Sequence, residues 1–203
     1  MSTSSNPALT AVAAQKDRAP RVVTLLTTGK LIIDDREALC RVRNMSATGM
    51  MIETNAALEV GQELRIGIRC GSEIDARVAW VRDGAAGLAL LTTIDVEAAL
   101  ATQPRVSRIV RPRRARAPRL AAECPIEVDA RGQVHQGVLL NISQSGARLR
   151  LTFRPAHDDR LILYIPGLPM KSAAVRWVRD AEVGVGFYEV LPFSVLAEWS
   201  ARR

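Results

Sequence analysis

The stretch Asn141-Ile142-Ser143-Gln144-Ser145-Gly146 decides the fold because it has a counterpart, Asn44-Met45-Ser46-Ala47-Thr48-Gly49, 97 positions earlier. Both copies read Asn-x-Ser-x-x-Gly, and both lie between runs of residues that are typical of β-strands. The same offset places Trp80-Val81-Arg82-Asp83 on Trp177-Val178-Arg179-Asp180. Landmarks that recur in one order at one spacing predict a tandem repeat of a single domain of about 95 residues.

Turn signals divide each repeat into short segments of strand character. Apolar and polar residues alternate strictly in Glu63 to Arg69, as in a half-buried strand. Asp83-Gly84 and Arg131-Gly132 are typical of hairpin turns. Short strands at this spacing, followed by helical patterns at Asp95 to Thr102 and Pro192 to Trp199, predict a mainly β protein. We expect two tandem six-stranded antiparallel barrels, each followed by a short C-terminal helix.

The repeat and the composition predict four segments along the chain. They are a flexible tail at 1–17, a first domain at 18–102, an arginine-rich linker or switch at 103–116, and a second domain at 117–203. Seven arginines and no acidic residue lie between Arg105 and Arg119. Such a block is typical of a polyanion partner, of a phosphate ligand or of a solvated linker, and composition alone does not choose among them.

Composition and motifs argue against several classes of protein. Three scattered cysteines without metal-ligand spacing imply neither a disulfide framework nor a zinc site, and they fit a reducing compartment. Residues 1–15 do not have the pattern of a signal peptide, and no apolar run is long enough to cross a membrane. A cytoplasmic location is therefore expected. Because no nucleophile elbow, P-loop or useful carboxylate pair occurs, we expect a binding protein without catalysis, metal or cofactor.

These residues resemble the PilZ domain family. An arginine ahead of the first strand is followed 22 residues later by the Asn-x-Ser-x-x-Gly motif, as from Arg119 to Asn141. The Trp-Val-Arg strand ahead of Gly184-Val185-Gly186-Phe187, and the helix start at Leu191-Pro192-Phe193, also look like that family. The resemblance covers nearly the whole chain as two copies, from about residue 18 to 101 and from about 113 to 203.

The resemblance implies a bacterial barrel that binds cyclic di-GMP and relays its level to a protein partner in motility, exopolysaccharide or biofilm machinery. The ligand site implied in the second unit comprises Arg114, Arg116, Arg119, Asn141, Ser143 and Gly146. A weaker site is implied in the first unit, at Arg18, Arg21, Asn44, Ser46 and Gly49. Nucleic acid is not expected as a partner, because aromatic residues make up only 4% of the chain and no stacking platform is evident.

The chemistry of such a site can be stated from the side chains. A guanidinium fork matches both a phosphate and the O6/N7 edge of guanine. Asn141 and Ser143 add short polar groups, and Gly146 would let the backbone turn through positive φ and approach the ligand. Trp80 and Trp177, on alternating strands, are expected to pack in the core or between the units, with stacking on guanine as the alternative.

The arginine motif departs from the family pattern in both units. The family has Arg-x-x-x-Arg ahead of the first strand, but Asp17 and Ala115 occupy the first position when the second falls on Arg21 and Arg119. Asp17 would repel phosphates, whereas Ala115 only removes a contact that neighbouring arginines can replace. The second unit is therefore the better candidate. The alternative is a PilZ-like protein-interaction scaffold that has lost nucleotide binding.

Overall fold

The computed structural model describes residues 27–68, 73–96 and 117–203. Several expectations fall outside these ranges: the tail at 1–17, the arginine-rich segment at 103–116, and all but the start of the helix expected over 95–102. The candidate site residues Arg18, Arg21, Arg114 and Arg116 also lie outside them.

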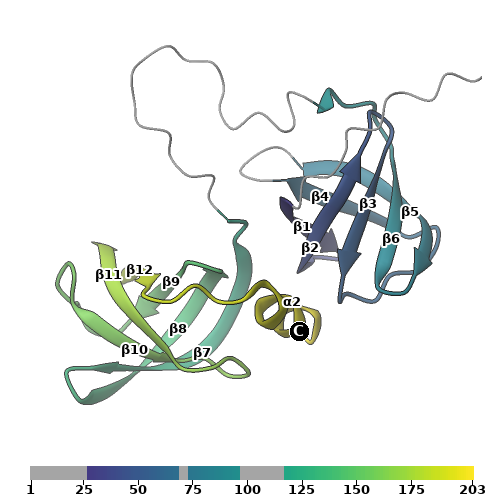
Figure 1. Ribbon diagram of the computed structural model, residues 1–203. Coiled ribbons are helices and arrows are strands. Elements are labelled where there is room, and N and C mark those ends of the chain that lie inside the picture. Colours follow the sequence, from purple (N-terminus) through teal and green to yellow (C-terminus); the bar gives the residue numbers. More distant parts are fainter. Residues whose placement is uncertain (1–26, 69–72, 97–116) are drawn as a thin grey trace, which may run out of the picture.

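Each repeat folds into a closed six-stranded antiparallel barrel (Figure 1). The strands of the first barrel are β1 (Thr27–Ile33), β2 (Arg36–Met45), β3 (Gly49–Thr54), β4 (Glu63–Ile68), β5 (Glu73–Arg82) and β6 (Ala85–Leu90). They are hydrogen-bonded in the order β1-β2-β3-β6-β5-β4, and β4 closes the barrel on β1.

The second barrel repeats this topology. Its strands are β7 (Leu120–Ala130), β8 (Gln133–Ser143), β9 (Gly146–Leu151), β10 (Arg160–Tyr164), β11 (Lys171–Arg179) and β12 (Glu182–Phe187). The order around the barrel is β7-β8-β9-β12-β11-β10, the same as in the first unit. The predicted fold class, mainly β with two tandem six-stranded barrels, is confirmed.

The predicted hairpin turns have the backbone conformation that their residues favour. Asp83 and Gly84 have φ values of 48° and 74°, and Arg131 and Gly132 have φ values of 57° and 82°. Two successive residues with positive φ define the type I′ turn, whose twist matches that of the flanking strands. These turns connect β5 to β6 and β7 to β8, which fixes the strand register on either side.

Apolar side chains from alternate strand positions fill each barrel. Leu31, Ile52 and Ile66 are fully buried in the first core, and Val128 and Leu149 in the second. Cys40 belongs to the first core, where burial raises the pKa of its thiol to about 12. The thiol therefore stays neutral and behaves as a small apolar group.

The terminal helix α2 (Phe193–Ala201) follows Pro192, as predicted for the second unit. It buries Leu196, Ala197 and Trp199 against the second barrel, and the Trp199 indole donates a hydrogen bond of 2.8 Å to the Pro166 carbonyl. It is not long or apolar enough to span a membrane, and the same holds for every helix in the described ranges.

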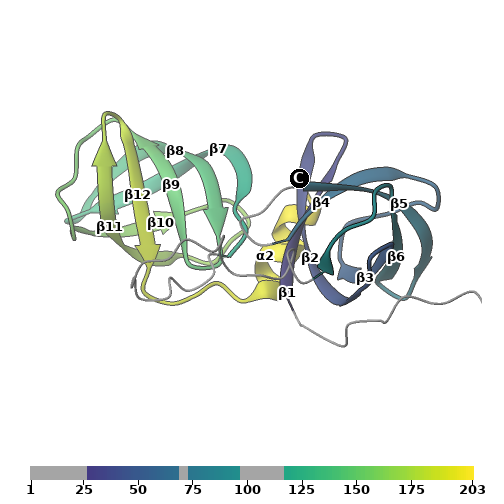
Figure 2. The same cartoon turned by 90° about the horizontal axis from the view of Figure 1, so that it is seen from above.

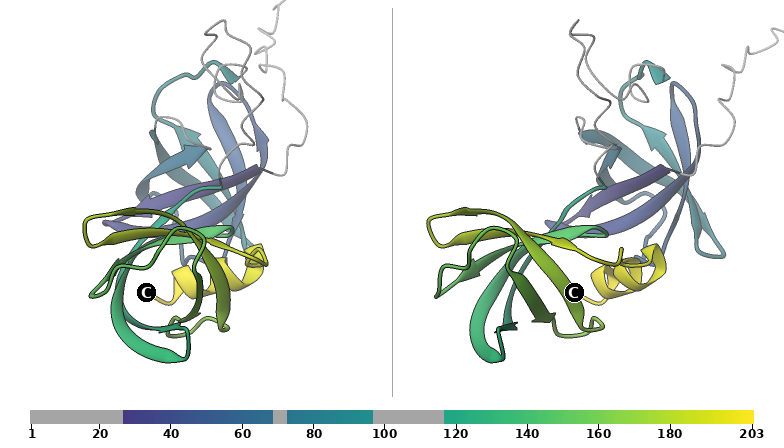
Figure 3. Two further views of the ribbon diagram at one scale, coloured as in Figure 1. Left: turned by 90° about the vertical axis from the view of Figure 1, so that its left-hand side faces the viewer. Right: turned by 60° about the vertical axis from the view of Figure 1, so that its left-hand side comes forward.

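The helix α2 lies between the two barrels in Figures 2 and 3 and contacts both. The backbone N–H of Leu39, in β2, donates to the Ser200 hydroxyl at 3.4 Å. The Arg41 guanidinium lies 4.4 Å from the centroid of the Phe193 ring. Leu39 is also part of the buried cluster of the second barrel, and Glu37 accepts a hydrogen bond from the Ala121 N–H. The two units therefore pack together through β2.

Candidate ligand-binding face of the second barrel

The Asn-x-Ser-x-x-Gly motif forms the tight hairpin between β8 and β9. Ser143 and Gly146 are paired across it, and Gln144 and Ser145 form the turn. The Ser143 hydroxyl donates to the Gly146 carbonyl at 3.1 Å, and Ser143 is only 3% exposed. The first unit has the same bond, in which Ser46 donates to the Gly49 carbonyl at 3.1 Å. In both units the motif serine closes the turn.

Gly146 is required for a reason different from the predicted one. It is not among the described residues with positive φ, so the prediction of a left-handed backbone there was wrong. A Cβ at this position would lie 2.2 Å from the Val185 carbonyl oxygen, in the facing strand β12. A glycine is needed because β9 and β12 approach each other closely at the end of the hairpin.

The tip of this hairpin also holds the segment that leads into α2. The Leu191 N–H donates to the Gln144 carbonyl at 2.7 Å, and the Gln144 side-chain amide donates to the Leu191 carbonyl at 3.1 Å. The Phe187 N–H donates to the Ser145 carbonyl at 2.9 Å. Leu191 is also fully buried. The hydrogen bonds and this burial together hold the hairpin tip against the segment that leads into α2.

A β-bulge places Asn141 on the outer face of the barrel. Leu139 points into the core, and the register of β8 against β9 shifts by one residue between Leu139 and Asn141. One extra residue reverses the face on which the following side chains lie. Asn141 therefore faces outward, where the Arg119 guanidinium donates to its Oδ1 at 3.1 Å. Two of the predicted site residues are thus brought into contact.

Asn141 begins a line of four residues that crosses the barrel from strand to strand. It is paired with Arg148 on β9, Arg148 with Gly184 on β12, and Gly184 with Trp177 on β11. Residues directly opposite each other on paired strands share a face of the sheet. We call these four residues the outer row of the second barrel.

Trp177 and Trp80 are partly exposed, contrary to the prediction that they pack in the core or between the units. Trp177 is 38% exposed, and Trp80 is 42% exposed. A bulge precedes each of them, between Val175 and Trp177 and between Val78 and Trp80, and it turns the indole outward. A Cβ on Gly184 would lie 2.0 Å from the Trp177 Nε1, so the indole lies directly on this glycine.

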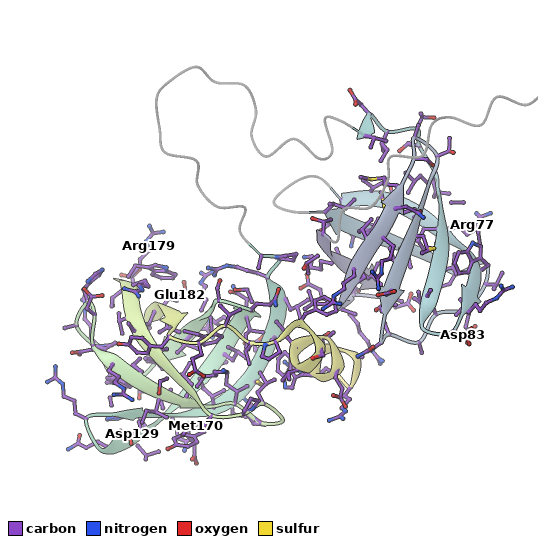
Figure 4. All side chains as sticks on the ribbon, in the orientation of Figure 1. Arg77, Asp83, Asp129, Met170, Arg179 and Glu182 are labelled. Atoms are coloured by element: carbon purple, nitrogen blue, oxygen red, sulfur yellow. The ribbon has the colours of Figure 1, made fainter. Side chains whose placement is uncertain are left out.

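Arg148 and Glu182 form an ion pair beside the outer row. The Arg148 Nε donates to the Glu182 Oε2 at 2.9 Å, and Nη2 donates to the same oxygen. Glu182 is the first residue of β12 and is paired with Arg179, the last of β11 (Figure 4). The face therefore carries the guanidinium groups of Arg119 and Arg148 beside the carboxylate of Glu182, and Arg150, directly opposite Glu182, lies on the same side of β9.

The first barrel has an equivalent row with different chemistry. It consists of Asn44, Met51, Gly87 and Trp80, in the same strand order. Met51 stands where the second unit has Arg148, and the Asn44 amide lies 4.0 Å from its sulfur. Ala85, 97 positions before Glu182, removes the carboxylate as well. The two motifs are alike, but only the row of the second barrel is charged.

Sequence reasoning did not single out Arg148 and Glu182. The signal was present in the alternation of β9, which puts Arg148 on the polar face of its strand. Only the structure shows that the bulge in β8 places Asn141 opposite Arg148, so the sequence pattern alone could not connect the two residues. Within the described ranges, no cluster of His, Cys, Asp and Glu could hold a metal ion.

Comparison of the sequence with protein-family models identifies the family of both barrels. The PilZ domain model matches the chain twice, at residues 15–103 and 113–196, one match for each barrel. The chain therefore belongs to the PilZ domain family, as a tandem of two such domains. No curated protein matches its sequence.

Solved structures with similar folds have low sequence identity to this chain. The Bacillus subtilis inhibitor of motility MotI/DgrA is 16% identical, with a TM-score of 0.36, over 89% of this chain and 97% of that one. Borreliella burgdorferi PlzA in complex with c-di-GMP is 9% identical, with a TM-score of 0.36, over 89% and 88%. Escherichia coli YcgR in complex with c-di-GMP is 12% identical, with a TM-score of 0.34, over 86% and 82%.

Proposed function

We propose that the chain is a non-catalytic cyclic di-GMP receptor and adaptor that acts on a protein of motility, exopolysaccharide or biofilm machinery. The ligand binds on the outer face of the second barrel. The observation that carries this proposal is the hydrogen bond from Arg119, just ahead of β7, to Asn141 of the motif. Membership of the PilZ family supports the choice of ligand.

The side chains of this face suit the chemistry of cyclic di-GMP. The ligand offers two phosphates and the O6/N7 edges of two guanines, and a guanidinium fork can donate two hydrogen bonds to either group. Arg119 supplies such a fork, and we propose that Arg114 and Arg116 complete the set from the preceding segment. Ser143 and Gly146 contribute through the hairpin, whose shape holds Asn141 in place.

The hairpin offers a route from the ligand to the rest of the molecule. Its tip is hydrogen-bonded to Leu191, which leads into α2, and α2 contacts β2 of the first barrel through Ser200. On the other side, Ala121 follows Arg119 closely and donates to Glu37 of β2. We propose that ligand binding changes the packing of the two barrels, and so the surface offered to a partner.

Isothermal titration calorimetry of the full chain with cyclic di-GMP tests the proposal. The expected result is saturable heat together with a rise in melting temperature, because a ligand that binds only the folded state stabilises it. Neither heat nor a thermal shift at high micromolar ligand would overturn the receptor function. The ligand-independent scaffold would then be the better description of the chain.

Replacing Asn141 by alanine is expected to weaken cyclic di-GMP binding about ten- to hundredfold. The change removes the oxygen that holds Arg119, and a hydrogen bond to a charged group contributes about 1.5–3 kcal/mol. Asn44→Ala is the matched control, since it removes the same residue of the first motif, where Met51 replaces Arg148. Calorimetry on both variants checks this, and equal losses would contradict the assignment to the second barrel.

The first barrel supports a second role in the same molecule. Its outer row carries Met51 in place of Arg148, Ala85 replaces the carboxylate of Glu182, and the ion pair near this row joins Arg43 to Glu53 at 2.6 Å. Its strand β2 is instead the surface on which α2 packs. We propose that the first barrel acts as a docking scaffold and that the ligand site is confined to the second.

A further inference from the structure

The two outer rows are the same at three of their four positions. Asparagine, glycine and tryptophan recur at Asn44 and Asn141, Gly87 and Gly184, and Trp80 and Trp177. The remaining position is Met51 in the first barrel and Arg148 in the second. Within the row, charge therefore differs only at this one place, next to the motif asparagine; two residues further along the strand, Glu53 of the first barrel corresponds to Arg150 of the second.

The ion pair with Glu182 uses only some of the N–H donors of the Arg148 guanidinium. Its Nε and Nη2 both donate to a single oxygen, Oε2 of Glu182. A guanidinium has five N–H donors, so the other donors remain for a second acceptor. The Arg148 side chain is 41% exposed and that of Glu182 26%, so Arg148 is accessible while its partner is more enclosed.

This ion pair contributes little to the stability of the fold. Pairs at such exposure are typically worth less than about 1 kcal/mol, because solvent screens the attraction and the side chains lose freedom. The first barrel closes with the same topology although Met51 and Ala85 occupy the two positions. The pair is therefore not needed to form a barrel of this kind.

We propose that Arg148 contacts the ligand directly and that Glu182 is a positioning residue that holds its guanidinium beside Asn141. The chemistry recognised is a pair of adjacent hydrogen-bond acceptors, which cyclic di-GMP offers both as phosphate oxygens and as the O6/N7 edge of guanine. This assignment rests on the proposed function, because it places Arg148 in the same site as Arg119. The site then draws on three places along the chain: Arg119 just ahead of β7, Asn141 in β8 and Arg148 in β9.

The decisive variant is Arg148→Met, which gives the second barrel the residue that the first already has. The expected result is a ten- to hundredfold loss of affinity for cyclic di-GMP, the usual effect of losing one charge-assisted contact. The melting temperature without ligand should stay within about 2 °C, since the pair is exposed. Met51→Arg, the reverse change, controls for added charge and should leave the affinity unchanged.

Cyclic di-AMP distinguishes whether Arg148 binds the phosphate oxygens or the O6/N7 edge of guanine. It has the same phosphates, but adenine carries an amine where guanine has O6. If Arg148 holds a phosphate, Arg148→Met weakens both ligands by the same factor; if it reads guanine, only cyclic di-GMP binding falls. Unchanged affinity for cyclic di-GMP would overturn the assignment, and with wild-type binding intact it would leave the proposed function standing. Absence of binding by the wild type would overturn both.

Two variants of Glu182 test the positioning role. Glu182→Ala frees Arg148 and should weaken binding about threefold to tenfold through the lost orientation. Glu182→Gln keeps an oxygen that accepts from Arg148 and should restore binding to within about twofold of the wild type. An equal loss in both variants, or no loss in Glu182→Ala, would overturn the role of Glu182. A merely structural role would instead lower the melting temperature of the unliganded chain in both.

Discussion

Replacement of Gly146 by alanine is expected to lower the melting temperature of the chain by about 5–10 °C and to abolish ligand binding. The added Cβ would meet the Val185 carbonyl oxygen at 2.2 Å, which is part of the backbone of a paired strand and cannot rotate away. Overpacking of this kind costs about 1–3 kcal/mol or more, and each kcal/mol shifts the midpoint of a chain of this size by about 2–4 °C. Thermal denaturation followed by circular dichroism measures the effect.

The matched control is Gly49→Ala in the first motif. A Cβ there would lie 3.0 Å from the Leu88 carbonyl oxygen, a contact that small shifts can relieve. We expect a smaller fall in melting temperature and little effect on the ligand. If Gly146→Ala melted like the wild type, β9 and β12 could not approach as closely as described, and the hairpin would not be fixed by this contact.

Replacement of Arg119 by alanine is expected to weaken cyclic di-GMP binding ten- to hundredfold. Arg119 is exposed and donates to Asn141, so its loss removes one charged fork from the site without opening a cavity in the core. A charge-assisted contact of about 1.5–3 kcal/mol corresponds to this factor. Calorimetry gives the affinity, and the melting temperature of the unliganded variant should stay close to that of the wild type.

Arg131→Ala controls for the loss of positive charge. Arg131 lies in the turn between β7 and β8, at the other end of these strands from Asn141, and pairs with Asp159 at 2.9 Å. The two variants have the same net charge, so a general attraction between the basic chain and the ligand would weaken equally in both. A loss in Arg119→Ala alone indicates a site, whereas equal losses would contradict it.

The barrels were predictable because local signals agreed with the fold. Alternation marked β4, and residues suited to positive φ marked the turns at Asp83-Gly84 and Arg131-Gly132. The β-bulges were not predictable, because one extra residue leaves no mark in composition. A bulge ahead of Trp80 and another ahead of Trp177 turn these residues to the surface, whereas the prediction placed them in the core or between the units.

The candidate site was predictable in its motif and not in its surroundings. Asn141, Ser143 and Gly146 were recognisable because their spacing is preserved in both copies. Their roles depend on which strand lies opposite: Ser143 closes a turn, Gly146 makes room for β12, and Asn141 meets Arg119. The pairing of β8 with β9 also adds Arg148 to the candidate site, although no local sequence pattern connects Arg148 with Asn141.

The packing of Leu39 has a consequence for how the chain unfolds. This residue belongs to β2 of the first barrel, yet its side chain is part of the buried cluster of the second, beneath α2. The boundary of the repeat in the sequence is therefore not the boundary of the cooperative unit in the folded molecule. Since a ligand stabilises every part of the unit that unfolds together with its site, occupancy of the second barrel should also protect the first.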